Sequence, residues 1–159
     1  MTKIKIYAFG FAVVLAIMAA LVMSADAKPQ QPDFILQRAD VVKVYDGDTI
    51  FVNIPNVPPV FGKRIGVRIS NIDTPEMHSR CKGEQARAYE RNLATEAKMM
   101  VAKQIGEAST ITLTEVKRDK FFRINAVVLV DGVNVTDQLV AAKLARPYFG
   151  GTKQSWCLK

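Results

Sequence analysis

The stretch KRIGVRISNIDTPE, residues 63–76, joins a strand pattern to a small group of charged side chains. Its first ten residues alternate between apolar and polar positions, so a β-strand is predicted over 63–72. Asp73 and Glu76 follow at once in a proline-containing loop, and Arg68 interrupts the apolar alternation. Two acids and an arginine at the end of one strand suggest a shared partner, and the rest of the chain indicates which one.

Similar alternation, bounded by turn residues, predicts strands on both sides of this stretch. Amphipathic patterns predict a long helix that ends before Gly106 and a short helix near the C-terminus. The predicted strands cover 41–45, 49–54, 63–72, 110–116 and 121–130, and the predicted helices cover 84–105 and 136–144. Five mostly antiparallel strands and two helices predict an α+β fold, in which the strands close a small barrel and the long helix covers one end.

The same patterns predict which helix faces are buried and where the loops lie. The long helix is expected to bury an apolar stripe formed by Tyr89, Leu93, Ala97, Met100 and Val101, and the short helix a stripe formed by Val135, Leu139 and Ala142. A tight turn is predicted at 46–47, a proline-rich loop at 56–62 and a charged turn at 117–120.

The N-terminus has the three parts of an export signal. Lys3 and Lys5 supply its positive start, and an apolar run over 6–23 follows them. An A-x-A cleavage site at 25–27 ends the signal, so the mature chain is expected to begin at Lys28. The apolar run also reaches the lower length limit for crossing a bilayer, so an uncleaved anchor helix is the alternative.

The remainder has the composition of one globular domain. Hydrophobic residues make up 49% and charged residues 23% of the 159 residues, which separates this chain from disordered ones. The predicted organisation is a signal peptide over 1–27, a flexible Pro/Gln-rich arm over 28–37 and a single domain over 38–159. We expect a periplasmic or secreted monomer that has no stable membrane association once the signal is removed.

Charge and cysteine content indicate the partner and the compartment. The formal net charge is +7, and removal of the signal leaves about +6, which favours an anionic partner such as nucleic acid or a lipid surface. The sequence holds two cysteines, Cys81 and Cys157, the number that one disulfide needs in an oxidising compartment. A single histidine argues against a zinc cluster.

Three charged segments lie at strand ends or in adjoining turns: DGDT at 46–49, RISNIDTPE at 68–76 and KRDKFFR at 117–123. If the strands pair as predicted, all three segments meet on one rim of the barrel. Asp48 and Asp73 would there offer hard oxygen ligands that, with a backbone carbonyl and water, suit Ca²⁺. The alternative for the acids of the first segment is local turn chemistry, because aspartate commonly bonds the backbone two residues on.

Arg68 and Arg123 place guanidinium groups within strand patterns. Such a group ordinarily faces solvent or pairs with a carboxylate. In a functional site its planar fork grips a phosphate, and two forks beside a divalent cation neutralise the charge that builds on a phosphorane-like transition state. Glu76 is then the acid available to polarise an attacking water.

The segments DGDTIFV, RISNIDTPE and DKFFR resemble the three motifs of the staphylococcal nuclease (thermonuclease) family, in that family's order. The resemblance covers residues 38–146. It implies an oligonucleotide-binding (OB) barrel with helices, and an endonuclease that uses Ca²⁺ to cleave DNA and RNA and leaves 3′-phosphate ends. A non-catalytic OB-fold module that binds nucleic acid is the alternative; it would use the basic surface but not the acids.

The resemblance also implies roles for individual residues. The implied calcium ligands are Asp48, Asp73 and the backbone carbonyl of Thr74, the implied catalytic residues are Arg68, Glu76 (the general base) and Arg123, and the expected substrate contacts are Lys120, Phe121 and Tyr148. At 121–122 the sequence has Phe-Phe where the family has Tyr-Gly, and it ends without the family's last long helix. A Cys81–Cys157 bridge is expected to tie the tail down instead, with Trp156 packed against it.

Overall fold

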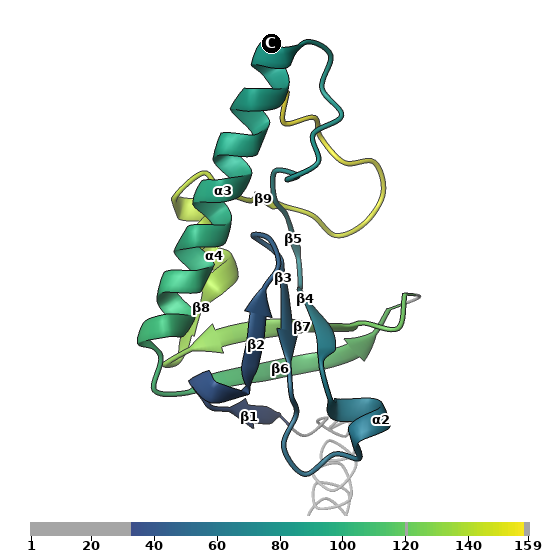
Figure 1. Ribbon diagram of the computed structural model, residues 1–159, viewed down its shortest axis with the longest axis vertical. Helices are drawn as coiled ribbons and strands as arrows, with labels where there is room; N and C mark the ends of the chain where they lie inside the picture. Colours follow the sequence, from purple (N-terminus) through teal and green to yellow (C-terminus); the bar gives the residue numbers. More distant parts are fainter. Residues whose placement is uncertain (1–32, 120, 158–159) are drawn as a thin grey trace, which may run out of the picture. The chain divides into compact units, whose positions relative to one another are not determined.

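The computed structural model describes residues 33–119 and 121–157 of the chain (Figure 1). The predicted signal peptide with its cleavage site, the first residues of the predicted arm, and Lys120 lie outside the described residues. Within the described part, no helix combines the length and the apolar character that crossing a membrane requires.

Most strands belong to one curled, mixed sheet (Figure 1). Its strands, in spatial order, are β1 (Phe34–Leu36), β6 (Ile111–Arg118), β7 (Ile124–Val130), β4 (Ile65–Ile69), β3 (Thr49–Val52) and β2 (Val41–Val44), with β8 (Val133–Asn134) added to β7. Neighbouring strands run antiparallel except β4 and β7, which are parallel. A separate antiparallel pair joins β5 (Ile72–Asp73) to β9 (Arg146–Pro147). With one long and one short helix on this half-barrel, the predicted OB-type α+β fold is confirmed.

Apolar side chains from alternating strand positions form the core, as the period-two pattern predicts. They include Ile50, Val52, Val67, Ile69, Ile111, Leu113, Ala126 and Val128, each at most 1% exposed. Full burial of an isoleucine or leucine side chain contributes roughly 1.5–3 kcal/mol, so this set holds the curled sheet together.

The long helix α3 (Glu84–Glu107) forms as predicted, but its buried face is rotated from the predicted stripe. The buried positions are Glu90, Ala94, Ala97, Val101 and Ile105. Tyr89 is 42% exposed, so its predicted burial was wrong, while Leu93 and Met100 are only partly buried. Ala97 and Val101 are buried as predicted, but the N-terminal half of the face turns by one position because Glu90 is drawn inward by hydrogen bonds from the loop after β5.

Two segments expected to lack regular structure are ordered. Residues 34–36, inside the predicted flexible arm, form β1 and pair with β6, and Leu36 is fully buried. The one-turn 3₁₀ helix Arg38–Asp40 follows directly. The predicted loop at 56–62 contains the one-turn helix α2 (Pro59–Gly62), which begins with proline at a position where its missing N–H costs nothing.

The remaining differences are at element ends. Helix α4 (Val135–Ala141) is shorter than predicted; Asn134 Oδ1 caps it by accepting from Thr136 N at 2.9 Å, and Ala142 is exposed rather than buried. Strand β6 extends to Arg118, so half of the predicted charged turn is strand. Strand β7 begins only at Ile124, which leaves the Phe-Phe pair in the β6–β7 loop.

Candidate functional site

The DGDT segment passes from β2 to β3 in close contact with α3 and with the loop after β5. Gly47 makes this approach possible, because a Cβ at that position would lie 2.7 Å from Ala97 Cβ and 3.1 Å from Thr74 Cγ2. A larger residue would push the segment away from both neighbours. The backbone N–H of Asp48 donates to Asp46 Oδ1 at 3.1 Å, which is local turn chemistry. The first two sequence motifs therefore meet at Gly47.

Asp48 is a buried carboxylate that pairs with Arg68. It is 4% exposed, and Arg68 Nη1 donates to its Oδ1 at 2.5 Å. Nη2 of the same guanidinium donates to the Ile72 carbonyl at 3.1 Å, so Arg68 links the start of β3 to β5. Thr49 Oγ1 also donates to Asp48 Oδ1, at 3.0 Å. Burial, followed by repulsion from Asp48, raises the pKa of Asp46 to about 6.

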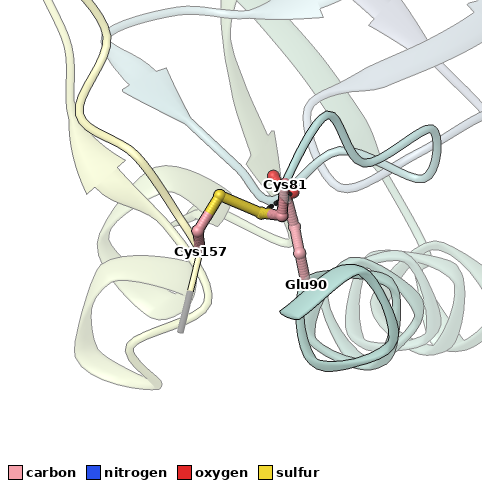
Figure 2. A group of neighbouring side chains, drawn as sticks. All are labelled: Cys81, Glu90 and Cys157. Carbon is pink, nitrogen blue, oxygen red and sulfur yellow. Dashed lines mark hydrogen bonds between the residues drawn. A yellow bond between two sulfur atoms is a disulfide. The ribbon is translucent and has the colours of Figure 1, made fainter. Parts of the chain in front are cut away.

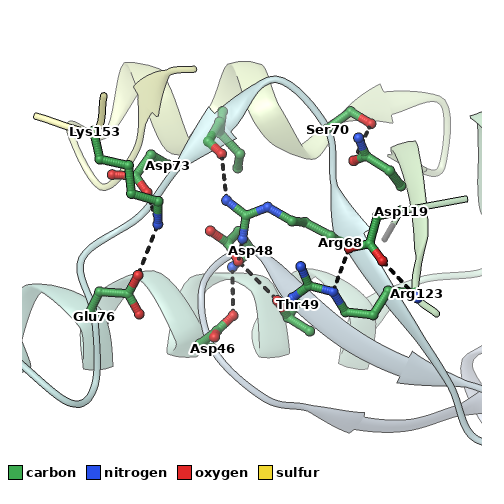
Figure 3. A network of polar contacts seen from close by, with 12 residues as sticks. Asp46, Asp48, Thr49, Arg68, Ser70, Asp73, Glu76, Asp119, Arg123 and Lys153 are labelled. Atoms are coloured by element: carbon green, nitrogen blue, oxygen red, sulfur yellow. Dashed lines mark hydrogen bonds and ion pairs between the residues drawn. The ribbon is translucent and has the colours of Figure 1, made fainter. Parts of the chain in front are cut away.

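Asp73 is equally buried, and its carboxylate contacts the C-terminal segment, residues 148–157 (Figure 3). Lys153 Nζ lies 2.6 Å from Asp73 Oδ1 and 3.0 Å from Glu76 Oε1, and Trp156 Nε1 donates to Asp73 Oδ2 at 2.9 Å. Burial disfavours the charge of Lys153, but its bonds to the two carboxylates outweigh that effect and raise its pKa. One amine therefore joins the predicted calcium ligand to the predicted base.

A buried acid on α3 anchors the loop that carries Glu76. Glu90 is 5% exposed and accepts the backbone N–H of Glu76 at 3.2 Å and Ser79 Oγ at 2.5 Å. These bonds satisfy the carboxylate away from water, as a buried acid requires. They also fix the loop to the helix, while the Glu76 side chain itself remains 56% exposed.

Arg123 immediately precedes β7, and Asp119 fixes its position. Asp119 Oδ2 accepts Arg123 Nε at 2.8 Å, and Oδ1 accepts the backbone N–H groups of Phe121 and Arg123. Burial acts to raise the pKa of Asp119, but these bonds outweigh it and lower the pKa. The Arg123 stem passes over Gly66, where a Cβ would lie 3.2 Å from Arg123 Cγ. Since Gly66 and Arg68 share a face of β4, both guanidinium groups lie on that face (Figure 3).

Two of the three expected substrate contacts lie in the described part of the chain, and they differ in their surroundings. Phe121 is 66% exposed, and the Arg123 guanidinium lies 5.4 Å from its ring centroid. The Tyr148 hydroxyl instead donates to the Gly151 carbonyl at 2.9 Å and so belongs to the internal structure of the C-terminal segment. Lys120 lies outside the described residues. Of the two described residues, Phe121 is the one that the structure brings beside a predicted catalytic side chain.

Phe122, where the family has glycine, has a left-handed backbone with φ of 62°. A bulky side chain is strained in that conformation, which glycine adopts readily. The Arg118 guanidinium lies 4.1 Å from the Phe122 ring centroid, and this cation–π contact offsets part of the strain. The loop thus keeps a backbone suited to glycine although the side chain has changed.

The expected Cys81–Cys157 disulfide is present, with an S–S distance of 2.07 Å (Figure 2). Among the described residues, Cys81, Glu90 and Cys157 form the one group of three potential metal ligands whose ligand atoms all lie within 4.8 Å of one another. Because the two sulfurs are bonded to each other, they offer no thiolate to a metal. This group is therefore not the predicted calcium site.

The predicted calcium ligands suit a hard cation that takes a few oxygen ligands from the protein and the rest from water. Asp48 and Asp73 are each 4% exposed, and both carboxylates already have a cationic side chain as partner. Thr74, 2% exposed, follows Asp73 directly and approaches Gly47. Two buried carboxylates and one backbone carbonyl, completed by water, are a donor set that Ca²⁺ accepts.

Several residues that shape the site were missed from the sequence. Asp119 had a recognisable signal, because an aspartate in a turn commonly accepts the backbone N–H of the residue two positions later. The role of Gly66 in leaving room for Arg123 could be recognised only once the parallel pairing of β4 and β7 was known. Lys153 and Trp156 gave no signal, since they lie about 80 positions from Asp73. Trp156 was expected to pack on the disulfide, and its indole N–H bonds Asp73.

Comparison with known proteins gives one family match. A family model described as staphylococcal nuclease homologue matches residues 66–156, more than half of the chain. The matched region contains the RISNIDTPE and DKFFR motifs and the C-terminal segment up to Trp156, and it begins after DGDT. No curated protein matches the chain.

Proposed function

The chain belongs to the staphylococcal nuclease family, and we propose that it is an exported, calcium-dependent endonuclease that hydrolyses phosphodiester bonds in DNA and RNA. Family membership supports a hydrolase of the nuclease type that acts on nucleic acid. Calcium dependence, export and 3′-phosphate products are the finer parts of the proposal. They rest on the site residues and on the N-terminal sequence.

One observation supports the proposal most: two arginines and two buried aspartates from separate segments lie in one neighbourhood (Figure 3). Arg68 bonds Asp48, Arg123 lies over Gly66 on the same face, and the approach at Gly47 brings Asp48 toward the Asp73 loop. A protein that only bound nucleic acid would gain nothing from acids where phosphates approach, because they repel each other. The basic net charge supports a polyanionic substrate.

Each residue has a distinct chemical role in this proposal. Asp48, Asp73 and the Thr74 carbonyl would hold Ca²⁺, which when bound supplies positive charge to the scissile phosphate. Arg68 and Arg123 donate to the non-bridging oxygens and stabilise the charge of the five-coordinate transition state. Glu76 accepts a proton from the attacking water as the new P–O bond forms. The P–O5′ bond then breaks, the 5′-oxygen takes a proton from solvent and leaves as a hydroxyl, and the phosphate stays on the 3′ side.

A digestion assay tests the proposal. The purified mature protein is incubated with plasmid DNA and with RNA, in Ca²⁺ and in chelator. We expect cleavage of both substrates only with Ca²⁺, and fragments whose 3′ ends a polymerase extends only after phosphatase treatment. Substrate that is bound tightly but stays intact would contradict the proposal that the protein is an enzyme.

That outcome would favour the second candidate, a non-catalytic OB-fold module that binds nucleic acid. One observation supports it: Asp48 and Asp73 are already neutralised by Arg68 and Lys153. A module of this kind needs its acids only as structural partners for basic side chains.

Export is tested separately by mass spectrometry of the mature N-terminus. A chain that begins at Lys28 supports signal cleavage and a periplasmic or secreted enzyme. A chain that retains residues 1–27 in the membrane fraction contradicts it and favours the uncleaved anchor.

A further inference from the structure

The C-terminal segment covers the two acids to which the proposed function assigns the cation and the general base. Lys153 Nζ contacts Asp73 Oδ1 and Glu76 Oε1 (Figure 3). Trp156 Nε1 contacts Asp73 Oδ2. Within the described residues, the side-chain partners of the Asp73 carboxylate all come from this segment. A cation that binds Asp73 must therefore displace or share these contacts with the C-terminal segment.

One part of the segment is held firmly. Trp156 is 7% exposed, and the Arg146 guanidinium lies 3.8 Å from its ring centroid. The same guanidinium donates to the Ser155 carbonyl at 2.9 Å. The next residue, Cys157, is bonded to Cys81. Because its neighbours on both sides are tied down, Trp156 is expected to stay on Asp73 when other contacts change.

Lys153 is the part that can move. Its side chain is 42% exposed, and its polar side-chain partners within the described part of the chain are the two carboxylates. Gly150 and Gly151, just before it, have left-handed backbones, with φ of 105° and 89°. A half-exposed ammonium on a flexible four-carbon stem can turn into solvent when another cation takes its place on the buried Asp73 carboxylate. Lys153 can thus leave Asp73 without disturbing Trp156.

Ammonium and divalent cation compete for the same oxygens. Lys153 Nζ lies on Asp73 Oδ1, a predicted ligand atom, at 2.6 Å, and a cation on that carboxylate would face a like charge at contact distance. The tethered segment makes this competition intramolecular, so Lys153 acts at a high effective concentration. Soluble monovalent ions compete far less effectively.

We propose that Lys153 competes with the divalent cation for the site. Lys153 must leave Asp73 and Glu76 before the cation can bind, so this residue sets the calcium affinity of the site. The inference rests on the proposed calcium site at Asp73. It goes beyond that site, because it assigns to the disulfide-tied C-terminal segment the control of when the site is loaded. At low Ca²⁺ the lysine closes the site, and at high Ca²⁺ the cation displaces it.

A luminescence titration tests the proposal. Tb³⁺ substitutes for Ca²⁺ at oxygen sites, and the single tryptophan of the chain, Trp156, lies on Asp73, so excitation of tryptophan reports a cation at this position. Displacement of Tb³⁺ by Ca²⁺ then gives the calcium dissociation constant. We expect Lys153→Met to bind Ca²⁺ about tenfold more tightly than wild type, since two ion pairs are lost, and Lys153→Arg to stay near wild type.

Lys103→Met is the matched control, because Lys103 is an exposed lysine on α3 and the substitution removes the same charge. Lys103→Met is expected to change calcium affinity less than twofold, because it removes only the long-range repulsion between one positive charge and the cation. Equal affinities of wild type and Lys153→Met, or equal gains in the two methionine variants, overturn the proposal. So does the lack of any sensitised Tb³⁺ signal in wild type and Lys153→Met alike.

A second measurement avoids substitutions altogether. An amine-reactive acetylating reagent is applied to the wild-type protein with and without saturating Ca²⁺, and modification is followed lysine by lysine by mass spectrometry. Acetylation at Lys153 should accelerate severalfold with Ca²⁺, while Lys103 reacts at a constant rate. An unchanged rate at Lys153 contradicts the displacement.

The two proposals can fail independently. If the Lys153→Met affinity gain is found but no nucleic acid is cut, the proposed function is wrong and the competitor role stands. If Ca²⁺-dependent cleavage is found while Lys153→Met leaves the calcium dissociation constant unchanged, the nuclease stands and the competitor role is wrong.

Discussion

At the scale of single residues, the site depends on positions where a side chain is missing as much as on those where one is present. Gly47 allows the DGDT segment to touch α3, and Gly66 leaves room for the stem of Arg123. Neither glycine has the left-handed backbone that would require it for conformational reasons. Both are needed because two chain segments come closer than a Cβ permits.

Gly47→Ala is therefore expected to destabilise the protein by about 1–3 kcal/mol, since the new Cβ would lie 2.7 Å from Ala97 Cβ. Gly106→Ala is the matched control: it lies on the same helix as Ala97, and its Cβ would meet nothing within 4 Å. The control should be neutral or stabilising by up to about 1 kcal/mol through helix propensity. Urea unfolding measures both, and equal midpoints for the two variants would disprove the packing argument.

The arginines are predicted to act on the reaction, and Arg68 also supports the fold through its bond to the buried Asp48 carboxylate. Arg68→Ala and Arg123→Ala should each lower kcat roughly 10²- to 10⁴-fold, because each removes a charge from the transition state. Arg91→Ala is the control, since its ion pair with Glu84 lies on the surface of α3. Steady-state cleavage rates check this. Near-wild-type rates for both site variants would remove the roles assigned to them.

Asp46 gives the calcium-free protein a pH dependence of definite sign. Its pKa is about 6 in the folded state against 3.8 in the reference state, so between these values the folded protein binds the extra proton. Stability from this group is complete below pH about 4 and is lost as pH rises through about 6. Asp46→Asn, which keeps the acceptor for Asp48 N, should remove a slope on the order of 1 kcal/mol per pH unit. Urea unfolding in chelator from acid to neutral pH measures it; parallel profiles would refute the prediction.

At the scale of elements, the sequence predicted the strands that have a regular apolar alternation and missed the short strands that form only by pairing with another strand. Alternation identified β2, β3, β4, β6 and β7, because each has one face in the core. It missed β1, β8 and β9, which are two or three residues long and exist only through pairing. In the N-terminal half of α3 the stripe was displaced by one position, because a buried glutamate broke the rule that acids face solvent, whereas Ala97 and Val101 are buried as predicted.

The β6–β7 loop should behave as a unit organised by Asp119. Asp119→Ala removes the acceptor of two backbone N–H groups and of the Arg123 guanidinium, so we expect kcat to fall at least about tenfold. Asp119→Asn keeps the backbone bonds and should retain more activity. Substrate affinity and kcat measured apart test this, since misplacement of Arg123 acts chiefly on kcat. Identical kinetics for the two variants would mean that the loop bonds do not orient Arg123.

At the scale of the whole molecule, the candidate site could be predicted only in part. Asp48, Arg68, Asp73 and Arg123 could be proposed from the sequence because short motifs carry them. The contribution of the C-terminal segment was not predictable, because Lys153 reaches Asp73 only through a chain path set by the disulfide and by β9. Contacts over such separations have no local pattern, so they appear only in the folded structure.

The disulfide should therefore affect both stability and the order of the C-terminal segment. It joins residues 76 positions apart, and closing such a loop contributes roughly 4 kcal/mol in the chain-entropy model. We expect the Cys81→Ser/Cys157→Ser variant to lose up to about that amount in urea unfolding, and wild type under reductant to match it.

Because Trp156 lies beside Cys157, removal of the bridge should also speed proteolytic cleavage within residues 148–157 far more than cleavage in the β6–β7 loop. If stability fell but cleavage of the segment did not accelerate, the contacts of Arg146 and Trp156 would be sufficient to hold it. The disulfide would then act only on the unfolded chain.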